Sequence, residues 1–346
     1  MVLFKSWKFC GVHFAPLLLP LDRRLQTLSV ALWFMLAILI GSVTAIIFMY
    51  LILYTNYWWI PVLYLTWMIF DRKCQVRGGR PERVQKWARN WSLWRFYCNY
   101  FPIRLIRTVE LDQTKNYIFG SHPHGLLCSG MFGAFATEGA DVGKLFPNFK
   151  IHGTTLSLNF WFPLTREWIL SLGGVSASKE SISYLMKEPG GVIAVIVVGG
   201  AEESMFASQT QVSLVLNKRK GFIKIALQHG AQLVPTFSFG EAYIYNIRST
   251  QPGTWIYTLQ EKFKNMVGFA PVLFMGRGLF QYSFGLIPHR KPVNIVVGEP
   301  IQVKQVPNPS REDIEVLHAK YKEALLDLYS KYNPIYGDSS ISLKIL

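Results

Sequence analysis

Residues 116–125 read Asn-Tyr-Ile-Phe-Gly-Ser-His-Pro-His-Gly. An apolar run, typical of a buried strand, ends here in a turn that carries two histidines, His122 and His124. The proline between them has a fixed φ, and the glycine after them accepts unusual backbone angles, so the turn is suited to holding both rings in place. Histidines this close together also occur in ordinary surface loops, and the surrounding sequence has to decide between the two interpretations.

Other segments predict a sheet around this strand. Residues 117–120, 192–198, 233–239 and 293–297 are apolar on both faces, as central strands are. Helical patterns alternate with them: residues 221–228 precede a glycine, and after a Ser310 cap with Asp313 the apolar positions recur at helical spacing, at Ile314, Leu317, Tyr321, Leu325 and Leu328. We therefore expect a mixed α/β domain over residues 111–346.

The N-terminal part has the composition of a membrane anchor. Residues 25–70 contain no charged side chain, which is far longer than the roughly 20 residues that one spanning helix needs. Thr55, Asn56 and Pro61 interrupt the run, so it predicts a membrane-embedded helical hairpin. Arginines and lysines flank both ends, which places residues 1–24 and the chain after residue 70 in the cytosol.

Residues 71–110 are basic and aromatic, a pattern that fits either the headgroup interface or a helix packed on the following domain. The net charge of +15 together with 50% hydrophobic residues favours an anionic membrane surface or an anionic ligand, such as coenzyme A, over nucleic acid. The four cysteines show no paired spacing, so neither a disulfide framework nor a zinc site is indicated.

Polar groups follow three of the expected strands, where a twisted α/β sheet places its ligand site. These groups are the two histidines, Glu202 and Glu203 after a Gly-Gly-Ala turn, and Glu241 after Phe239-Gly240. A histidine removes a proton from a hydroxyl near neutral pH, and a carboxylate on its other nitrogen fixes the tautomer. We therefore expect His124 and Glu203 to form a catalytic dyad. Glutamates that cap a helix are the alternative.

A nucleophilic mechanism is a second option, because Ser121, Cys128 and Ser129 lie near the histidines, although no G-x-S-x-G elbow is present. Arg219 and Lys220, just before a helix, could bind the phosphates of coenzyme A or lie in a solvated loop. Arg277, between two glycines, could hold a phosphate or a backbone carbonyl.

An ordered set of short motifs over nearly the whole chain resembles the type 2 diacylglycerol acyltransferase family. The matching stretches are Arg77-Gly78-Gly79-Arg80, Tyr100-Phe101-Pro102, His122-Pro123-His124-Gly125, Arg166-Glu167-Trp168, Val198-Gly199-Gly200-Ala201-Glu202-Glu203-Ser204, Arg219-Lys220-Gly221-Phe222, Phe237-Ser238-Phe239-Gly240-Glu241, Gly276-Arg277-Gly278 and Val296-Val297-Gly298-Glu299-Pro300. Residues 14–17, 23–27 and 280–288 look most like the monoacylglycerol acyltransferase branch.

The resemblance implies an enzyme that moves an acyl group from acyl-CoA to an acylglycerol hydroxyl, with no metal and no cofactor besides this co-substrate. His124, or else His122, would be the base, and Tyr100, Phe101, Pro102, Arg219, Lys220, Glu241 and Arg277 would bind substrate. It also implies residence in the endoplasmic reticulum membrane or on lipid droplets, contact with membrane lipid, and a cytosolic catalytic domain, and it leaves a homo-oligomer open.

Within that class, 2-monoacylglycerol is the expected acceptor, with diacylglycerol or a long-chain alcohol as alternatives. Two hypotheses outside the acyltransferases remain. The protein could be a membrane-anchored lipid-binding protein with no catalytic activity, or an ester or thioester hydrolase.

Overall fold

The computed structural model describes residues 5–346 except 207–210, 249–252, 268–270 and 339. The helices are α1 (Leu21–Phe34), η1 (Met35–Leu39), α2 (Ile40–Tyr54), α3 (Trp59–Phe70), η2 (Cys74–Val76), α4 (Glu82–Arg89), α5 (Ser92–Tyr100), α6 (Ser129–Phe135), α7 (Val142–Leu145), η3 (Ser157–Trp161), α8 (Thr165–Ser171), α9 (Lys179–Leu185), α10 (Ala201–Met205), α11 (Gly221–His229), η4 (Glu241–Tyr243), α12 (Trp255–Val267) and α13 (Arg311–Tyr336). The strands are β1 (Trp7–Phe9), β2 (Val12–Phe14), β3 (Arg104–Arg107), β4 (Tyr117–His122), β5 (Lys150–Thr155), β6 (Val175–Ser176), β7 (Val192–Val197), β8 (Gln211–Leu214), β9 (Gln232–Phe239), β10 (Asn246–Arg248), β11 (Leu273–Met275), β12 (Asn294–Val297) and β13 (Ser342–Ile345).

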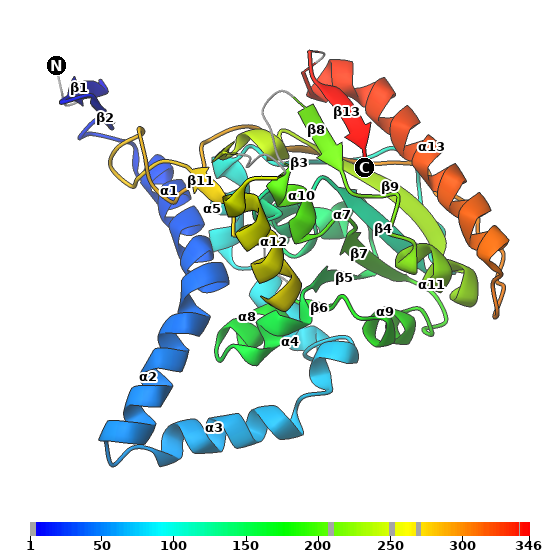
Figure 1. Ribbon diagram of the computed structural model, residues 1–346, viewed down its shortest axis with the longest axis horizontal. Helices are drawn as coiled ribbons and strands as arrows, with labels where there is room; N and C mark the ends of the chain where they lie inside the picture. Colours follow the sequence, from blue (N-terminus) through cyan, green and yellow to red (C-terminus); the bar gives the residue numbers. More distant parts are fainter. Residues whose placement is uncertain (1–4, 207–210, 249–252, 268–270, 339) are drawn as a thin grey trace.

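A seven-stranded sheet with the order β3-β12-β9-β4-β7-β5-β6 lies at the centre of the molecule (Figure 1). Strand β4 runs between β9 and β7 and is parallel to both. Strand β12 is antiparallel to β9. The mixed α/β class and all four expected strands are confirmed, with β4 extending to His122. The sheet begins earlier than residue 111, because β3 pairs with β12.

Alternate residues of the central strands face two separate cores, as the two-residue period of a strand requires. Ile118 packs on one side with α9, α11 and α13, whereas Phe119 packs on the other side with α1, α5 and α6. Helix α13 begins with the expected capping box of Ser310 and Asp313. Its buried stripe covers one face of the sheet, so both faces of β4 are shielded from solvent.

The N-terminal helix is continuous from Leu21 to Tyr54, with 34 residues and a hydropathy of 2.6 in its most apolar window. Its first half, α1, buries Trp33 and Phe34 in the core against α5. In α2 only Gly41 and Thr44 are buried, and the exposed remainder is almost wholly apolar. The largely exposed part of this helix therefore starts about ten residues later than the uncharged run at residue 25.

Helix α3 has only 12 residues, fewer than the roughly 20 that cross a bilayer. In the described part of the chain, Leu21–Tyr54 is the one helix long and apolar enough to span a membrane. Figure 1 shows α2 and α3 diverging from the turn that joins them. The expected hairpin of two paired helices is therefore not shown; the structure has one long apolar helix followed by a short one at an angle to it.

Residues 71–110, the basic aromatic segment, were expected either to lie at the headgroup interface or to pack on the domain, and the structure shows a different outcome for α4 and α5. In α5, Trp94, Tyr97 and Tyr100 are buried in the core, and the Trp94 indole donates to the Ala88 carbonyl at 2.7 Å. Helix α5 is therefore a helix packed on the domain. In α4, by contrast, Trp87 is 63% exposed. This helix therefore has the exposed aromatic side chain expected of a segment at the membrane interface.

Candidate active site

The polar groups predicted at strand ends lie together at one edge of the sheet. Strands β9, β4 and β7 are neighbours and parallel, so their carboxyl ends coincide. His122 ends β4, Glu203 lies in α10 directly after β7, and Glu241 follows β9. The His122–Pro123 peptide bond is cis. Three segments far apart in the sequence thus supply the candidate catalytic groups to one site.

The His124 ring is oriented by a backbone carbonyl. Its Nδ1 lies 3.1 Å from the carbonyl oxygen of Gly125 and 3.3 Å from Ser204 Oγ, which itself donates to the same carbonyl at 2.7 Å. A carbonyl can only accept, so Nδ1 carries the proton and Nε2 presents its lone pair. Among the residues that the structure describes, Nε2 has no hydrogen-bond partner. The ring is half-buried, and burial lowers its pKa below the ordinary 6.5 against the raising effect of the Gly125 carbonyl.

Among the described residues, Glu203 makes no hydrogen bond to this ring, so the predicted dyad is wrong in its geometry. The Glu203 carboxylate instead accepts the backbone N–H of His124 at 2.7 Å and that of Val215 at 2.9 Å. Burial raises the pKa of Glu203 to about 7, although both amide hydrogen bonds lower it. The tautomer-fixing role expected of Glu203 belongs to the Gly125 carbonyl, and Glu203 holds the backbone of the histidine turn.

Glu241 supports the other end of the same turn. Its two carboxylate oxygens accept the backbone N–H groups of Ser129 at 2.7 Å and Gly130 at 2.8 Å, at the start of α6. A Cβ on Gly125 would lie 2.7 Å from the Glu241 side chain, so only glycine fits between them. Burial raises the pKa of Glu241 to about 7. Glu241 is therefore a helix-capping glutamate, which is the alternative given in the sequence analysis, and it holds the histidine turn in place.

His122 is fully buried and pairs with a residue that the sequence suggested only as a core position. Its Nε2 lies 3.0 Å from the hydroxyl of Tyr321 on α13, and that hydroxyl donates to the Gly120 carbonyl at 3.1 Å. Both contacts are satisfied when His122 Nε2–H donates to the hydroxyl, which leaves Nδ1 unprotonated. Burial lowers the pKa of His122 to about 3, so the ring is neutral at physiological pH.

One sequence signal for this contact existed, namely a glycine in the middle of a central strand. Gly120 leaves room for the Tyr321 hydroxyl, which a side chain at position 120 would displace. Such glycines mark a close approach of another group. Ser204 follows Glu203, which was expected from the sequence to lie beside His124, but the contact of its own side chain with the ring was not predicted.

The nucleophilic alternative receives no support from the environment of Cys128. Burial and the carboxylates of Glu241 and Glu203 hold the pKa of the Cys128 thiol well above its ordinary value, so it stays protonated. A protonated thiol is a poor nucleophile. Ser129 and Ser121 are buried, and the backbone of Ser129 serves as a donor to Glu241.

Of the two predicted phosphate-binding residues, Arg219 lies in a cationic cluster around Glu202, next to the histidine turn. Lys218 Nζ lies 2.5 Å, Arg219 3.0 Å and Lys264 3.8 Å from this carboxylate. Arg219 also donates to the Gly199 carbonyl at 3.3 Å. Three cations surround one carboxylate, so the cluster keeps a positive charge at the edge where β7 ends. Lys220 instead pairs with Glu315 on α13.

Four other residues expected to bind substrate have structural contacts. Tyr100 and Phe101 are fully buried, and the Tyr100 hydroxyl donates to the Pro288 carbonyl at 2.6 Å. Arg277 is buried and donates to the carbonyls of the loop that follows it, which is the carbonyl alternative given for it. Pro102 is exposed and follows α5. Tyr100 therefore joins α5 to the segment that precedes β12.

The sequence of this chain matches a known protein family. Residues 50–345 match the protein family described as diacylglycerol acyltransferase. The chain belongs to this family. The resemblance expected from the motifs is therefore confirmed, as is the enzyme class, an acyltransferase, and the apolar helix indicates an association with membranes.

Relatives in the family cover nearly the whole chain. 2-Acylglycerol O-acyltransferase 1 of Bos taurus is 48% identical over 94% of this chain and 96% of its own length. The Homo sapiens protein of the same name is 46% identical over the same shares. Diacylglycerol O-acyltransferase 2 of Homo sapiens is 42% identical over 91% of this chain and 81% of its own length. Among solved structures, a 1-acyl-sn-glycerophosphate acyltransferase of Thermotoga maritima has a TM-score of 0.41 and 13% identity, covering 89% of this chain and 96% of that one.

Proposed function

We propose that the protein transfers a fatty acyl group from acyl-CoA to a free hydroxyl of 2-monoacylglycerol and thereby forms diacylglycerol. The names of the relatives at 48% and 46% identity support this acceptor. The observation that carries the chemistry is the His124 ring, whose Nδ1 is held by the Gly125 carbonyl while Nε2 stays unpaired among the described residues. That ring stands at the sheet edge where ligands of α/β folds bind.

In this mechanism His124 Nε2 takes the proton of the acceptor hydroxyl as its oxygen attacks the thioester carbonyl carbon. A C–O bond forms, the C–S bond breaks, and the coenzyme A thiolate leaves and recovers the proton from the imidazolium. Glu203 and Glu241 keep the turn in position through its backbone amides. His122 stays neutral and holds the turn to α13 through Tyr321.

The cationic cluster of Lys218, Arg219 and Lys264 is the proposed site for the phosphates of coenzyme A. It adjoins α10, whose Glu203 binds the His124 backbone, so phosphates held there would leave the thioester close to the histidine turn. Guanidinium and ammonium groups form strong charge-assisted hydrogen bonds with phosphate oxygens. Glu202 keeps the three cations together in the absence of ligand.

The test is His124→Ala in purified proteoliposomes that receive acyl-CoA and 2-monoacylglycerol. Loss of the general base should lower the rate by about 10²- to 10⁴-fold. His229→Ala, at the end of α11, is the matched control and should keep the rate. If His124→Ala retains full activity, His124 is not the base. Consumption of acyl-CoA with release of free fatty acid alone would identify a hydrolase.

Diacylglycerol is the second candidate acceptor, because relatives at 42% identity are named diacylglycerol O-acyltransferase 2. Monoacylglycerol, diacylglycerol and a long-chain alcohol offered together with the same labelled acyl-CoA separate the three cases by their products. A faster reaction with diacylglycerol than with 2-monoacylglycerol would overturn the acceptor assignment and leave the acyl transfer intact.

We further propose that the protein resides in the endoplasmic reticulum membrane, and on lipid droplets that bud from it, with its catalytic domain in the cytosol. Arg23 and Arg24 precede the apolar segment while Arg72 and Lys73 follow it, and such residues favour the cytosolic side. Protease added to sealed microsomes should digest α13. Protection of α13 until detergent is added would place the domain in the lumen.

A further inference from the structure

The turn between η3 and α8 exposes apolar side chains on a strained backbone. Trp161 is 74% exposed and Leu164 is 45% exposed. Leu164 has a φ of 62°, and the Thr165 N–H donates across it to the Pro163 carbonyl at 2.8 Å, which closes a γ-turn. This kind of γ-turn is rare and strained for a residue with a side chain. Such a conformation persists only where surrounding contacts fix it.

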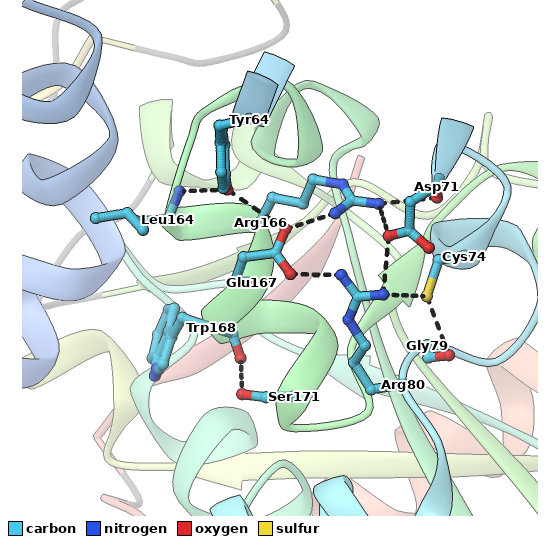
Figure 2. A network of polar contacts seen from close by, with 10 residues as sticks. All are labelled: Tyr64, Asp71, Cys74, Gly79, Arg80, Leu164, Arg166, Glu167, Trp168 and Ser171. Atoms are coloured by element: carbon cyan, nitrogen blue, oxygen red, sulfur yellow. Dashed lines mark hydrogen bonds and ion pairs between the residues drawn. The ribbon is translucent and has the colours of Figure 1, made fainter. Parts of the chain in front are cut away.

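The fixing contacts come from both apolar helices. On one side, Phe162 and Thr165 pack directly on α2, where a Cβ at Gly41 would lie 2.7 Å from a side-chain atom of each. On the other side, the Leu164 N–H donates to the Tyr64 hydroxyl of α3 at 3.2 Å, as Figure 2 shows. The turn is therefore wedged between α2 and α3, although it belongs to the catalytic domain.

A partly buried ionic network holds α3 and α8 together beside this turn (Figure 2). Arg166, only 2% exposed, donates to the carboxylate of Asp71 at the end of α3, to its carbonyl at 2.8 Å, and to Glu167 at 2.5 Å. Arg80 bridges the same two carboxylates, at 2.8 Å from Asp71 and 2.5 Å from Glu167. The network contains two cations and two anions, so it is neutral and can lie at a membrane boundary without a net charge to solvate.

Trp67 of α3 completes the junction from the apolar side. The Arg80 guanidinium lies 5.0 Å and that of Arg166 5.3 Å from the indole ring, within the range of a cation–π contact. Each arginine therefore contacts both the carboxylates of the network and the indole ring of Trp67. The position of α8 relative to α3 is therefore strongly determined.

We propose that Trp161 and Leu164 form a second membrane contact, carried by the catalytic domain, that inserts into a phospholipid bilayer between α2 and α3. The helices on either side are lipid-facing: the most apolar window of Leu21–Tyr54 is only 11% buried, and Leu63 on α3 is 62% exposed. A turn wedged between them shares their depth. Tryptophan favours the boundary between headgroups and acyl chains, and leucine the chains themselves.

This contact rests on the membrane association of the apolar helices and is independent of the acceptor that the enzyme uses. If the long helix were the only membrane contact, the catalytic domain could change its orientation relative to the bilayer surface. A second contact, held by the ionic network, would fix the domain against the lipid surface from which an acylglycerol must enter.

The test places an environment-sensitive fluorescent amino acid at position 161, or separately at 164, in vesicles of phosphatidylcholine that contain spin-labelled phosphatidylcholine. Position 63 on α3 is the lipid-exposed reference. Position 316 on α13 is the matched control, since Val316 is an apolar residue that is 52% exposed on the domain. We expect lipid quenching at 161 and 164 close to that at 63 and well above that at 316.

Quenching at 161 and 164 no greater than at 316 would overturn the proposal, whether the probes face water or a second protein chain. Arg166→Met should reduce quenching at 161 while leaving that at 63 unchanged, because the network no longer holds α8 against α3. Unchanged quenching at 161 in this variant would show that the network does not set the contact. Neither measurement depends on acyl transfer.

Discussion

Removing the hydroxyl of Tyr321 tests whether His122 must be held for catalysis. In Tyr321→Phe, the Gly120 carbonyl loses a donor and the buried His122 Nε2–H loses its acceptor. Leaving one buried polar group unpaired costs about 1–3 kcal/mol, so we expect the loss of both contacts to lower the free energy of unfolding by roughly 2–6 kcal/mol. Freed from α13, the histidine turn also shifts relative to the substrate. A misplacement of about 1 Å lowers the rate by as much as 10²-fold.

Acyl transfer in proteoliposomes and thermal unfolding of the same preparations measure the two effects. Tyr329→Phe is the control, because this tyrosine lies on the same helix, is buried to a similar degree, and donates to the Ile341 carbonyl at 2.8 Å, away from the histidines. It should lose stability and keep its rate. If Tyr321→Phe keeps its rate as well, the contact to His122 serves stability alone.

Three further expectations concern protonation and charge. Because burial lowers the pKa of His124 below 6.5, kcat/KM should rise with pH up to a pKa below that value and stay level through pH 8; a rise centred above pH 7 would exclude this histidine as the base. Burial raises the pKa of Glu203 from 4.5 to about 7, so the folded state binds the extra proton and stability is lost as pH rises through about 7. Relative to Glu203→Gln, the free energy of unfolding of the wild type should therefore fall by on the order of 3 kcal/mol between pH 4.5 and 8, as measured by chemical unfolding. If the wild type instead becomes more stable than Glu203→Gln as the pH rises, the burial argument is contradicted. Arg219→Gln should raise KM for acyl-CoA by about tenfold but leave KM for an acyl-pantetheine unchanged, with the exposed Lys144→Gln as control; an equal effect on both thioesters would place the phosphates elsewhere.

The sheet could be predicted because its central strands are buried on both faces and therefore read as continuous apolar runs. The meeting of His122, Glu203 and Glu241 followed from the rule that parallel strands end at the same edge. The particular contacts could not be predicted. Glu203 binds the amide of His124 and not its ring, and a residue sequence contains no information on which atom of a neighbour a side chain reaches.

The membrane segment shows a second limit of sequence reasoning. Residues 25–70 are uniformly uncharged, and charge alone does not separate a helix face that packs on protein from one that faces lipid. Trp33 and Leu53 are both uncharged and largely hydrophobic, yet the first is 2% exposed and the second 62% exposed. Only the position of α5, set by tertiary packing, distinguishes them. Arg80 and Arg166 lie in motifs that the family resemblance identified. That both would pair with the carboxylates of Asp71 and Glu167 could not be predicted from those motifs.

The continuity of the helix from Leu21 to Tyr54 has a practical consequence for making a soluble form of the enzyme. The residues that carry the chain toward the membrane also form one wall of the core, where Trp33 packs at an angle against Tyr97 with ring centroids 5.3 Å apart. A truncation placed after α3 would remove the anchor and open that wall to water, exposing aromatic surface that aggregates. A usable fragment has to keep residues 21–34, with polar residues replacing the exposed apolar ones of α2.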